Sequence, residues 1–307
     1  MKEPLKNQTI GFVGLGQMGY PIARTLVQAG FPVRVFDVRE ERIAPLVALG
    51  AIPAACLAEV VEPGGVVISM VPGDTELCQI ALNDPGIVRQ LGPGGLHLSL
   101  STISPDVVLS LTKYYATQGV ALVAATVSGR PEAAATRQLS VYVSGNAAAK
   151  DHARPILETI GSTLYDLGPA VESAVVMKLA ANYLILAALV AMGSAATFVE
   201  RHGLERELFL RAMRESVLFQ GSAVYAGYGR MIGALDYSDE NFSTALGLKD
   251  ASLIVHEAER LGLKLPVAQQ AYDALLAAQA AGHGKQSWAV LAEYAEKILE
   301  DHPQRNQ

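Results

Sequence analysis

The glycine-rich turn near the N-terminus most constrains what this chain can fold into. The segment "GFVGLGQMG" places Gly14, Gly16 and Gly19 in the GxGxxG spacing. The apolar run "TIGFV" leads into it, the helix-periodic stretch "YPIARTLVQAG" follows, and "FPVRVFD" then alternates like a strand. This order predicts the βαβ unit of a parallel sheet, with a dinucleotide pyrophosphate at the N-terminus of the helix.

Each glycine has a separate physical task in such a unit. Gly14 permits the tight turn, Gly16 lets the backbone approach the pyrophosphate, and Gly19 lets helix and strand pack closely. The predicted cofactor loop consists of Gly14, Leu15, Gly16, Gln17, Met18 and Gly19.

Asp37 ends the second predicted strand and lies 18 residues after Gly19. A carboxylate in this position accepts hydrogen bonds from the hydroxyls of an adenosine ribose and repels a 2′-phosphate. Arg39, two residues later, would instead pair with such a phosphate. The sequence therefore favours NAD over NADP and keeps NADP as the alternative.

The alternation of strands and helices continues over about 160 residues and then stops. Further strands are predicted in "GGVVISMVP", "GGLHLSLST", "VALVAATVSG" and "LSVYVSG", with helices starting at Asp74 and, capped by Ser104, at Pro105. Beyond Gly168 only helices are predicted, over 171–202, 205–219, 221–234, 243–262, 266–282 and 284–300. The predicted fold is therefore α/β, with a Rossmann-type doubly wound parallel sheet in residues 1–165 and an all-helical domain in residues 166–307.

The first helix of the second half is unusually apolar. Residues 179–199 form a run of 21 without a formal charge, long enough for a membrane span. However, seven of them are alanine, Asn182 lies among them, and basic residues do not flank one end preferentially. We therefore expect a buried or subunit-interface helix rather than a membrane helix, and a homodimer or homotetramer.

Composition excludes several classes of protein. The formal net charge is −6 and no basic run is present, which argues against nucleic-acid binding. Cys56 and Cys78 form no CxxC pair, so we expect two small, buried, reduced thiols, and the six histidines show no metal-ligand spacing. Residues 1–8 lack the apolar segment of a secretory signal. We expect a cytoplasmic protein without a metal.

Five motifs, in order, make the chain resemble the β-hydroxyacid dehydrogenases, a family that includes 3-hydroxyisobutyrate dehydrogenase and tartronate semialdehyde reductase. The motifs are "GFVGLGQMGYPIARTL", "MVP" (70–72) with "STISP" (101–105), "VSG" (127–129), "KLAAN" (178–182), and an F-x6-KD pattern from Phe242 to Asp250. The 6-phosphogluconate dehydrogenases and the imine reductases are more distant relatives of that family.

The resemblance implies a role for each motif. It assigns Lys178 and Asn182 to catalysis, and it assigns the substrate, a small carboxylate, to Ser128, Gly129, Phe242 and Asp250. Arg130, which departs from the family pattern, is a further candidate for substrate binding. It also implies that Val71, Pro72, Thr102 and Lys249 contact the cofactor. The implied reaction is hydride transfer between nicotinamide and a small β-hydroxyacid or its semialdehyde.

Elementary chemistry supports the role of the lysine. Hydride transfer to a carbonyl leaves an alkoxide, which needs a proton donor or a cation, and Lys178 supplies either. An apolar helix favours the neutral amine, which suits a group that accepts a proton during alcohol oxidation and returns it during reduction. Asn182 lies four residues further on and so shares the face of Lys178.

Departures from the family pattern keep other functions open. Arg130 and Pro131 follow the "SG" where the family often has glycine, and Arg130 either binds an anionic group or points to solvent. Ala124, Ala125 and Thr126 replace the family's Asp-Ala-Pro, and Ser99 replaces its aspartate. The alternatives are an imine reductase or reductive aminase of the same superfamily, and a non-catalytic NAD-binding protein.

Overall fold

A computed structural model describes residues 8–84, 86–216 and 221–295. The chain divides into two compact units, Met1–Lys178 and Leu179–Gln307.

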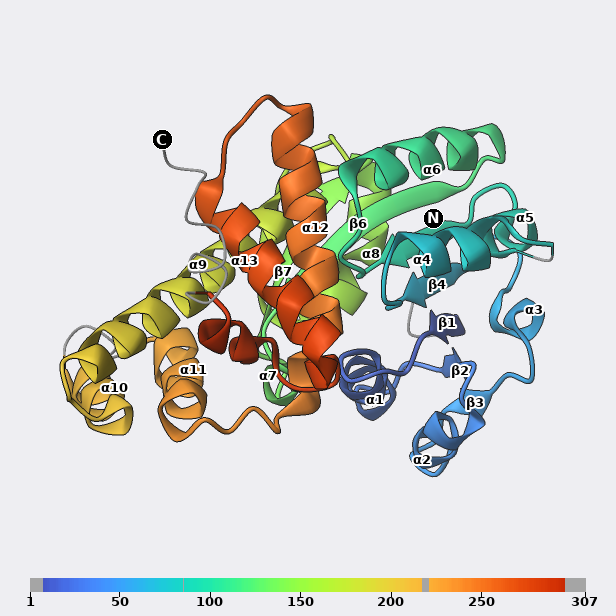
Figure 1. Ribbon diagram of the computed structural model, residues 1–307. Helices are drawn as coiled ribbons and strands as arrows, with labels where there is room; N and C mark the ends of the chain where they lie inside the picture. The colour runs from blue at the N-terminus through green and yellow to red at the C-terminus, as the bar shows by residue number, and fades with distance from the viewer. Residues whose placement is uncertain (1–7, 85, 217–220, 296–307) are drawn as a thin grey trace. The chain divides into compact units, whose positions relative to one another are not determined.

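The first unit is built on one sheet of eight strands in the order β3-β2-β1-β4-β5-β6-β7-β8 (Figure 1). The strands are β1 (Ile10–Val13), β2 (Val33–Phe36), β3 (Ile52–Pro53), β4 (Val66–Ser69), β5 (Leu96–Ser99), β6 (Ala121–Ser128), β7 (Leu139–Gly145) and β8 (Gly161–Asp166). The predicted doubly wound sheet is confirmed. The short strands β3 and β8 were not predicted.

One pairing breaks the parallel pattern. All neighbouring strands run parallel except β6 and β7, which are antiparallel, with Ala124 opposite Ser144 and Ser128 opposite Ser140. The connection between them, residues 129–138, holds a helix of only five residues, α7 (Pro131–Ala135). A parallel crossover needs a longer connection, so this short one returns the chain in the opposite direction.

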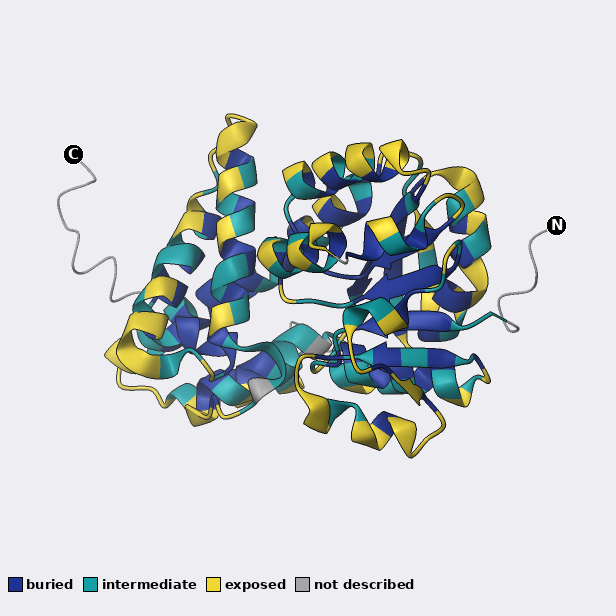
Figure 2. Cartoon of the chain, turned by 90° about the vertical axis from the view of Figure 1, so that its right-hand side faces the viewer, coloured by how far each residue is buried: buried dark blue, intermediate teal, exposed yellow. Residues whose placement is uncertain are grey.

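Helices cover both faces of the sheet. The remaining helices of this unit are α1 (Gly19–Gln28), the 3-10 turn Glu40–Arg42, α2 (Ala44–Val47), α3 (Leu57–Val60), α4 (Asp74–Leu82), α5 (Ile87–Leu91), α6 (Pro105–Thr117), α8 (Ala147–Ile160) and the start of α9 (Ser173–Arg201). The apolar faces of α1, α7 and α8 form one core with alternate residues of β1, β2 and β4–β7. Strands β1, β4 and β5 are fully buried and β6 is nearly so, whereas the edge strands β3 and β8 are largely exposed, as are the outer helix faces (Figure 2).

Local signals set the ends of several helices. Ser104 caps α6 as predicted, accepting a hydrogen bond from the Val107 amide at 3.3 Å. Both cysteines are free, but Cys56 is exposed and Cys78 is half-buried. The expectation that both are buried is wrong, because Cys56 lies in the surface loop that leads into α3.

A histidine lies fully buried on the face of the sheet that α6 covers. The ring nitrogens of His97 on β5 lie 2.6 Å from the Tyr115 hydroxyl on α6 and 2.8 Å from Ser69 Oγ on β4. Burial lowers the pKa of His97 to about 3. The neutral ring therefore links two strands to one helix at a point just before the loops that follow β4 and β5.

This burial predicts acid sensitivity. Because the folded pKa lies below the unfolded value of about 6.5, the unfolded chain binds a proton first as the pH falls. The contribution of the neutral His97 ring to the free energy of unfolding is complete above about pH 6.5 and is lost between there and pH 3.

We expect His97→Gln to reduce the fall in unfolding free energy between pH 7.5 and pH 5 by about 2 kcal/mol relative to wild type. Urea unfolding at both pH values measures it. The exposed His256→Gln is the control, and an unchanged pH dependence in His97→Gln would contradict the prediction.

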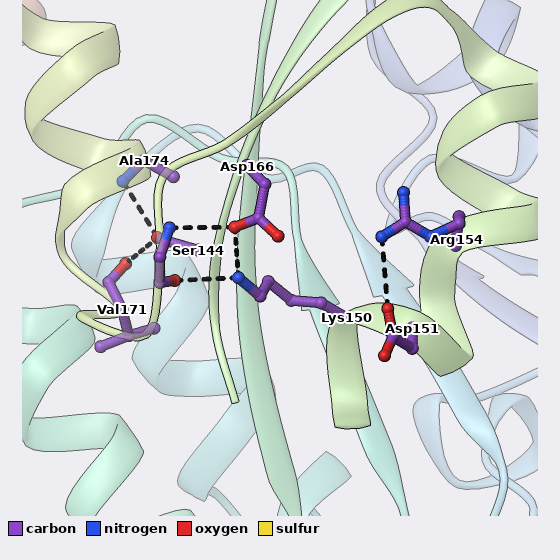
Figure 3. A network of polar contacts seen from close by, with 8 residues as sticks. Ser144, Lys150, Asp151, Arg154, Asp166, Val171 and Ala174 are labelled. Carbon is purple, nitrogen blue, oxygen red and sulfur yellow. Dashed lines mark hydrogen bonds and ion pairs between the residues drawn. The ribbon is translucent and has the colours of Figure 1, made fainter. Parts of the chain in front are cut away.

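A buried lysine ties the end of this unit together (Figure 3). Lys150 on α8 is 6% exposed, and its Nζ donates to Asp166 Oδ1 and, at 3.1 Å, to the Gly168 carbonyl. The Lys150 bond, with help from the Gly168 amide, holds the pKa of Asp166 below its usual range. The segment that leads into α9 is thereby fixed to the sheet.

These contacts explain where the first unit ends. The sequence places the boundary at residue 165, whereas the division in the structure falls at Lys178. Strand β8 continues to Asp166, and hydrogen bonds from β6 and β7 hold the first turn of α9. The first turns of α9 therefore belong to the sheet unit.

The second unit is helical in its described residues. After α9 it contains α10 (Arg206–Glu215), α11 (Ala223–Ala234), the 3-10 turn Glu240–Phe242, α12 (Thr244–Arg260), α13 (Pro266–Ala278), a π-helical turn Gln279–His283 and a 3-10 helix Trp288–Glu293. Helices α10 and α11 pair, as do α12 and α13 (Figure 1). The helix predicted over 284–300 begins only at Trp288 in its described part, as a 3-10 helix. Residues 284–287 are not helical, and the Thr244 amide and Oγ1 donate hydrogen bonds to the Gln286 carbonyl, with the Oγ1 also 3.4 Å from the Ser287 carbonyl.

The apolar helix α9 is only partly covered by its own chain. By length and composition the helix could cross a membrane, since its most apolar 18-residue window has a mean hydropathy of 2.0. Only 44% of that window is buried within the described chain. Leu184 is 69% exposed and Phe198 is 65% exposed. The exposed residues Ala180, Leu184, Ala191 and Phe198, together with the half-buried Ala187 and Ser194, recur at alternating spacings of four and three along one side of the helix.

Candidate dinucleotide and substrate site

The glycine loop has the geometry that a bound pyrophosphate requires. Gly14 has φ of +93°, and a Cβ there would lie 2.3 Å from the Met70 carbonyl oxygen. A Cβ at Gly19 would lie 1.9 Å from the Gly14 carbonyl oxygen, so only glycine lets α1 approach the strand so closely. The position of a Cβ at Gly16 is open, with its nearest neighbour at 3.9 Å. The backbone is thus accessible at the middle glycine and fixed at the outer two, which fits a dinucleotide.

Asp37 is held in place by this loop. It is 7% exposed, and its Oδ2 accepts a hydrogen bond of 2.6 Å from the Leu15 amide. Its Oδ1 accepts a bond of 2.9 Å from the Arg39 amide. A carboxylate has about four acceptor sites, so these bonds orient Asp37 and leave capacity for ribose hydroxyls. The end of β2 is thereby fixed relative to the glycine loop.

An arginine that the sequence analysis did not name lies beside Asp37. The Arg39 side chain is exposed, whereas Arg42 Nη1 lies 3.5 Å from Asp37 Oδ2. The same Arg42 nitrogen is the atom nearest to the open position at Gly16. Arg42 was missed because no spacing marks it. It reaches the site because the 3-10 turn after β2 brings it back toward the strand end.

Two loops at the carboxyl ends of β4 and β5 are tied to each other. The Val71 amide donates to Ser101 Oγ at 2.8 Å, and the Ser104 amide donates to Asp74 Oδ1 at 2.8 Å. Thr102 lies half-buried in the second loop. The predicted nicotinamide residues, including the exposed Pro72, therefore come from adjoining loops at one edge of the sheet.

The "VSG" segment ends the longest strand. Ser128 is half-buried at the end of β6, and Gly129 is exposed with φ of +142°. A Cβ at Gly129 would lie 2.7 Å from a Leu139 methyl carbon, so the turn requires glycine. Arg130 precedes α7, and its Nε lies 3.8 Å from Glu132 Oε2. Part of the Arg130 charge is therefore balanced locally.

The lysine and asparagine of the "KLAAN" motif lie on α9. Lys178 is half-buried at the end of the first unit, and Asn182 follows one helical turn later in the second unit, 2% exposed. Asn182 Nδ2 donates to Asp250 Oδ2 at 2.5 Å, and Lys249 Nζ lies 2.6 Å from Asp250 Oδ1. The bond to Asp250 fixes the orientation of the Asn182 amide.

Phe242 and Asp250 have structural partners in the second unit. The Phe242 ring packs on Trp288 with ring centres 4.4 Å apart, and Trp288 Nε1 donates to the Tyr228 hydroxyl at 2.8 Å. Asp250 is 1% exposed. The sequence did not indicate that Asp250 holds Asn182, because the two residues are 68 positions apart. In the described parts of the chain, no group of three or more His, Cys, Asp or Glu side chains is arranged to hold a metal ion.

Two family profiles match the chain in succession. The NAD-binding domain of 6-phosphogluconate dehydrogenase matches residues 9–168. The NAD-binding domain of NADP-dependent 3-hydroxyisobutyrate dehydrogenase matches residues 173–294. The chain belongs to the β-hydroxyacid dehydrogenase family. The expectation drawn from the five motifs is confirmed, and this family member is an NAD(P)-binding oxidoreductase with a C-terminal region like that of 6-phosphogluconate dehydrogenase.

Individual relatives agree with this assignment. The uncharacterized oxidoreductase YfjR of Bacillus subtilis is 33% identical over 92% of this chain and 98% of its own. The NAD-dependent L-serine dehydrogenase of Pseudomonas aeruginosa is 34% identical over 67% of this chain and 69% of its own. The structure of Mycobacterium tuberculosis 3-hydroxyisobutyrate dehydrogenase with L-serine matches with a TM-score of 0.79 at 26% identity, over 93% of this chain and 98% of the other.

Proposed function

We propose that this dehydrogenase interconverts a small β-hydroxyacid and its semialdehyde, with Lys178 as the general acid and base. The observation that carries the proposal is the pair on α9: Lys178, followed one turn later by the buried Asn182. The bond from Asn182 to Asp250 fixes an amide that would otherwise rotate. A buried amide with a defined orientation is suited to hold a substrate hydroxyl beside a proton acceptor.

The substrate carboxylate is assigned to the end of β6. Ser128 supplies a hydroxyl, and the turn at Gly129 presents backbone amides without a side chain. L-Serine and 3-hydroxyisobutyrate, named in the relatives, share a carboxylate and a primary alcohol on the β-carbon. We expect substrates of this chemical class, with Arg130 near the carboxylate end.

The chemistry divides between cofactor and protein. The nicotinamide accepts or returns the hydride when bound. Lys178 takes the hydroxyl proton during oxidation and returns it during reduction, so no net charge accumulates on the carbonyl oxygen. Asn182 orients that oxygen. Val71 and Thr102 lie in the two loops that we assign to the nicotinamide.

NAD is the proposed cofactor. Asp37 already accepts two backbone hydrogen bonds and presents its charge at the end of β2, where it would meet the ribose hydroxyls. A 2′-phosphate would face this carboxylate. Arg42 is the cation that would offset the repulsion, so its pairing with Asp37 leaves NADP as the weaker cofactor.

A substrate panel tests the function. Purified protein is assayed with L-serine, 3-hydroxyisobutyrate, larger 3-hydroxyacids, the matching semialdehydes and a cyclic imine, each with both cofactors. We expect turnover of at least one hydroxyacid and its semialdehyde, with a higher kcat/KM for NAD. Turnover of the imine alone would favour imine reduction. Tight NADH binding without any turnover would favour a non-catalytic binding protein.

We also propose that the enzyme is a homodimer paired along α9. The stripe of Ala180, Leu184, Ala187, Ala191, Ser194 and Phe198 spans about 27 Å along this helix and is apolar except for Ser194. If two copies pair antiparallel about a point near residue 189, Phe198 meets Ala180, Leu184 meets Ser194, and Ala187 meets Ala191. Each large side chain then lies opposite a small one, which permits the close approach that a stable isologous interface needs.

The double variant Leu184→Glu/Phe198→Glu tests this interface. We expect a dimer for wild type and a monomer for the variant, because two carboxylates would lose their water at the interface. Light scattering after size-exclusion chromatography measures the mass. Leu261→Glu, at a site 55% exposed but outside the stripe, should stay dimeric. A monomeric wild type would contradict the proposal, and partition into detergent would indicate a membrane helix instead.

A further inference from the structure

Two fully buried hydroxyls, those of Ser144 and Thr126, connect the sheet to the first turn of α9. Figure 3 shows Ser144 with its partners Val171 and Ala174. Ser144 on β7 lies directly opposite Ala124 on β6, and Thr126 lies two residues after Ala124. Residues two apart on a strand point to the same face, so the two hydroxyls share one face of the sheet. Both residues and the helix turn that they contact belong to the first unit.

Ser144 bridges the approach to the helix and its first turn. Its Oγ donates a hydrogen bond of 2.7 Å to the Val171 carbonyl and accepts one of 3.0 Å from the Ala174 amide. The amides of the first turn have no partners within a helix, so Ser144 caps one of them. The start of α9 is thereby fixed to β7.

Thr126 makes a bond of a different kind. Its Oγ1 donates to the Ala174 carbonyl oxygen at 2.7 Å. In α-helical geometry, the carbonyl of residue 174 accepts the amide of residue 178, which is Lys178. The Thr126 hydroxyl and the Lys178 amide therefore meet on one oxygen atom. The Ala174 carbonyl already accepts a hydrogen bond within the helix. The Thr126 bond is therefore not needed to satisfy an unpaired carbonyl, and its effect is to fix the position of this helix turn relative to β6.

Thr126 is also linked to the proposed substrate contact. It lies two residues before Ser128 on β6 and so points to the same side of the strand. One hydrogen bond thus connects the strand that carries Ser128 with the backbone of Lys178. This bond ties β6 to the first turn of α9, beside the Ser144 bonds that tie β7 to the same turn.

We propose that Thr126 and Ser144 are positioning residues that set the distance between Lys178 and a substrate held at Ser128. This inference rests on the proposed function. Reaction rates depend steeply on such distances, and a displacement of about 1 Å can cost about a hundredfold. The hydroxyls act through the first turn of α9, not by contact with the substrate.

Thr126→Val tests the proposal, because it keeps the shape of the side chain and removes its donor. We expect kcat to fall about tenfold to a hundredfold, with the dissociation constant for NADH unchanged. The midpoint of the pH–rate profile should shift, and the isotope effect with a substrate deuterated at the reacting carbon should rise. Thr126→Ser, which retains the hydroxyl, should recover most of the rate.

A matched variant separates positioning from stability. Thr244 is also fully buried, and its Oγ1 donates to the Gln286 carbonyl at 3.0 Å. Thr244→Val should lower the melting temperature to a similar extent as Thr126→Val and leave the pH–rate profile unchanged. If Thr126→Val matched wild type in kcat, pH profile and isotope effect, the inference would be overturned.

Amide hydrogen exchange makes the test independent of turnover. Loss of the Thr126 bond should raise the exchange rate of the Lys178 amide, while the amides near Leu189 stay protected. If wild type turns over no hydroxyacid, the proposed function fails. The exchange result then still tests whether Thr126 and Ser144 position the first turn of α9. Unchanged protection of the Lys178 amide in Thr126→Val and in Ser144→Ala would overturn that positioning role.

Discussion

Replacing Lys178 by alanine is expected to lower kcat by about a thousandfold, the middle of the range for loss of a positioned general acid–base group. The reason is that the hydroxyl proton then has no acceptor when the hydride leaves. The hydroxyacid KM and the NADH dissociation constant should change only a few-fold, because Ser128, Gly129 and the glycine loop remain. Steady-state kinetics in both directions and a fluorescence titration with NADH measure these effects.

A surface lysine provides the control. Lys264 lies exposed before α13, and Lys264→Ala should keep wild-type kinetics. An active Lys178→Ala enzyme would remove Lys178 from the mechanism while leaving the family membership intact. That result would favour a reaction in which the lysine is not essential, such as imine reduction.

Replacing Asp37 by asparagine is expected to change the ratio of kcat/KM for NADP to that for NAD by tenfold to a hundredfold in favour of NADP. Each hydrogen bond to a charged group contributes about 1.5–3 kcal/mol, and a factor of ten corresponds to about 1.4 kcal/mol. Asparagine keeps an oxygen for the Leu15 amide, so the loop stays in place. Loss of the negative charge also leaves Arg42 available to a 2′-phosphate.

The neighbouring Glu40 supplies a matched charge control. Glu40→Gln removes one negative charge from an exposed position in the turn after β2 and should change the cofactor ratio less than twofold. If Asp37→Asn behaved like Glu40→Gln, Asp37 would be a structural acceptor for the loop and not the residue that selects the cofactor.

Local patterns predicted the fold well where the signal was periodic. The βαβ unit, the cap at Ser104 and the apolar helix all follow from side chains a few residues apart. Strand β8 and the antiparallel direction of β7 were not predicted, and the helix predicted from residue 284 begins only at Trp288. These features depend on pairing with distant residues. The "F-x6-KD" motif named Asp250 but gave no sign that its carboxylate holds Asn182.

The sequence alone determined that the chain has a dinucleotide turn ending near Asp37 and a lysine and an asparagine on one helix face. Both features can be recognised from short, fixed separations in the sequence, because a tight turn requires glycine and a helix repeats every 3.6 residues. Only the tertiary structure decided which arginine stands beside Asp37 and that Thr126 meets the carbonyl that also receives the Lys178 amide. Those contacts join residues far apart in the chain, and their geometry exists only after the sheet has brought the segments together.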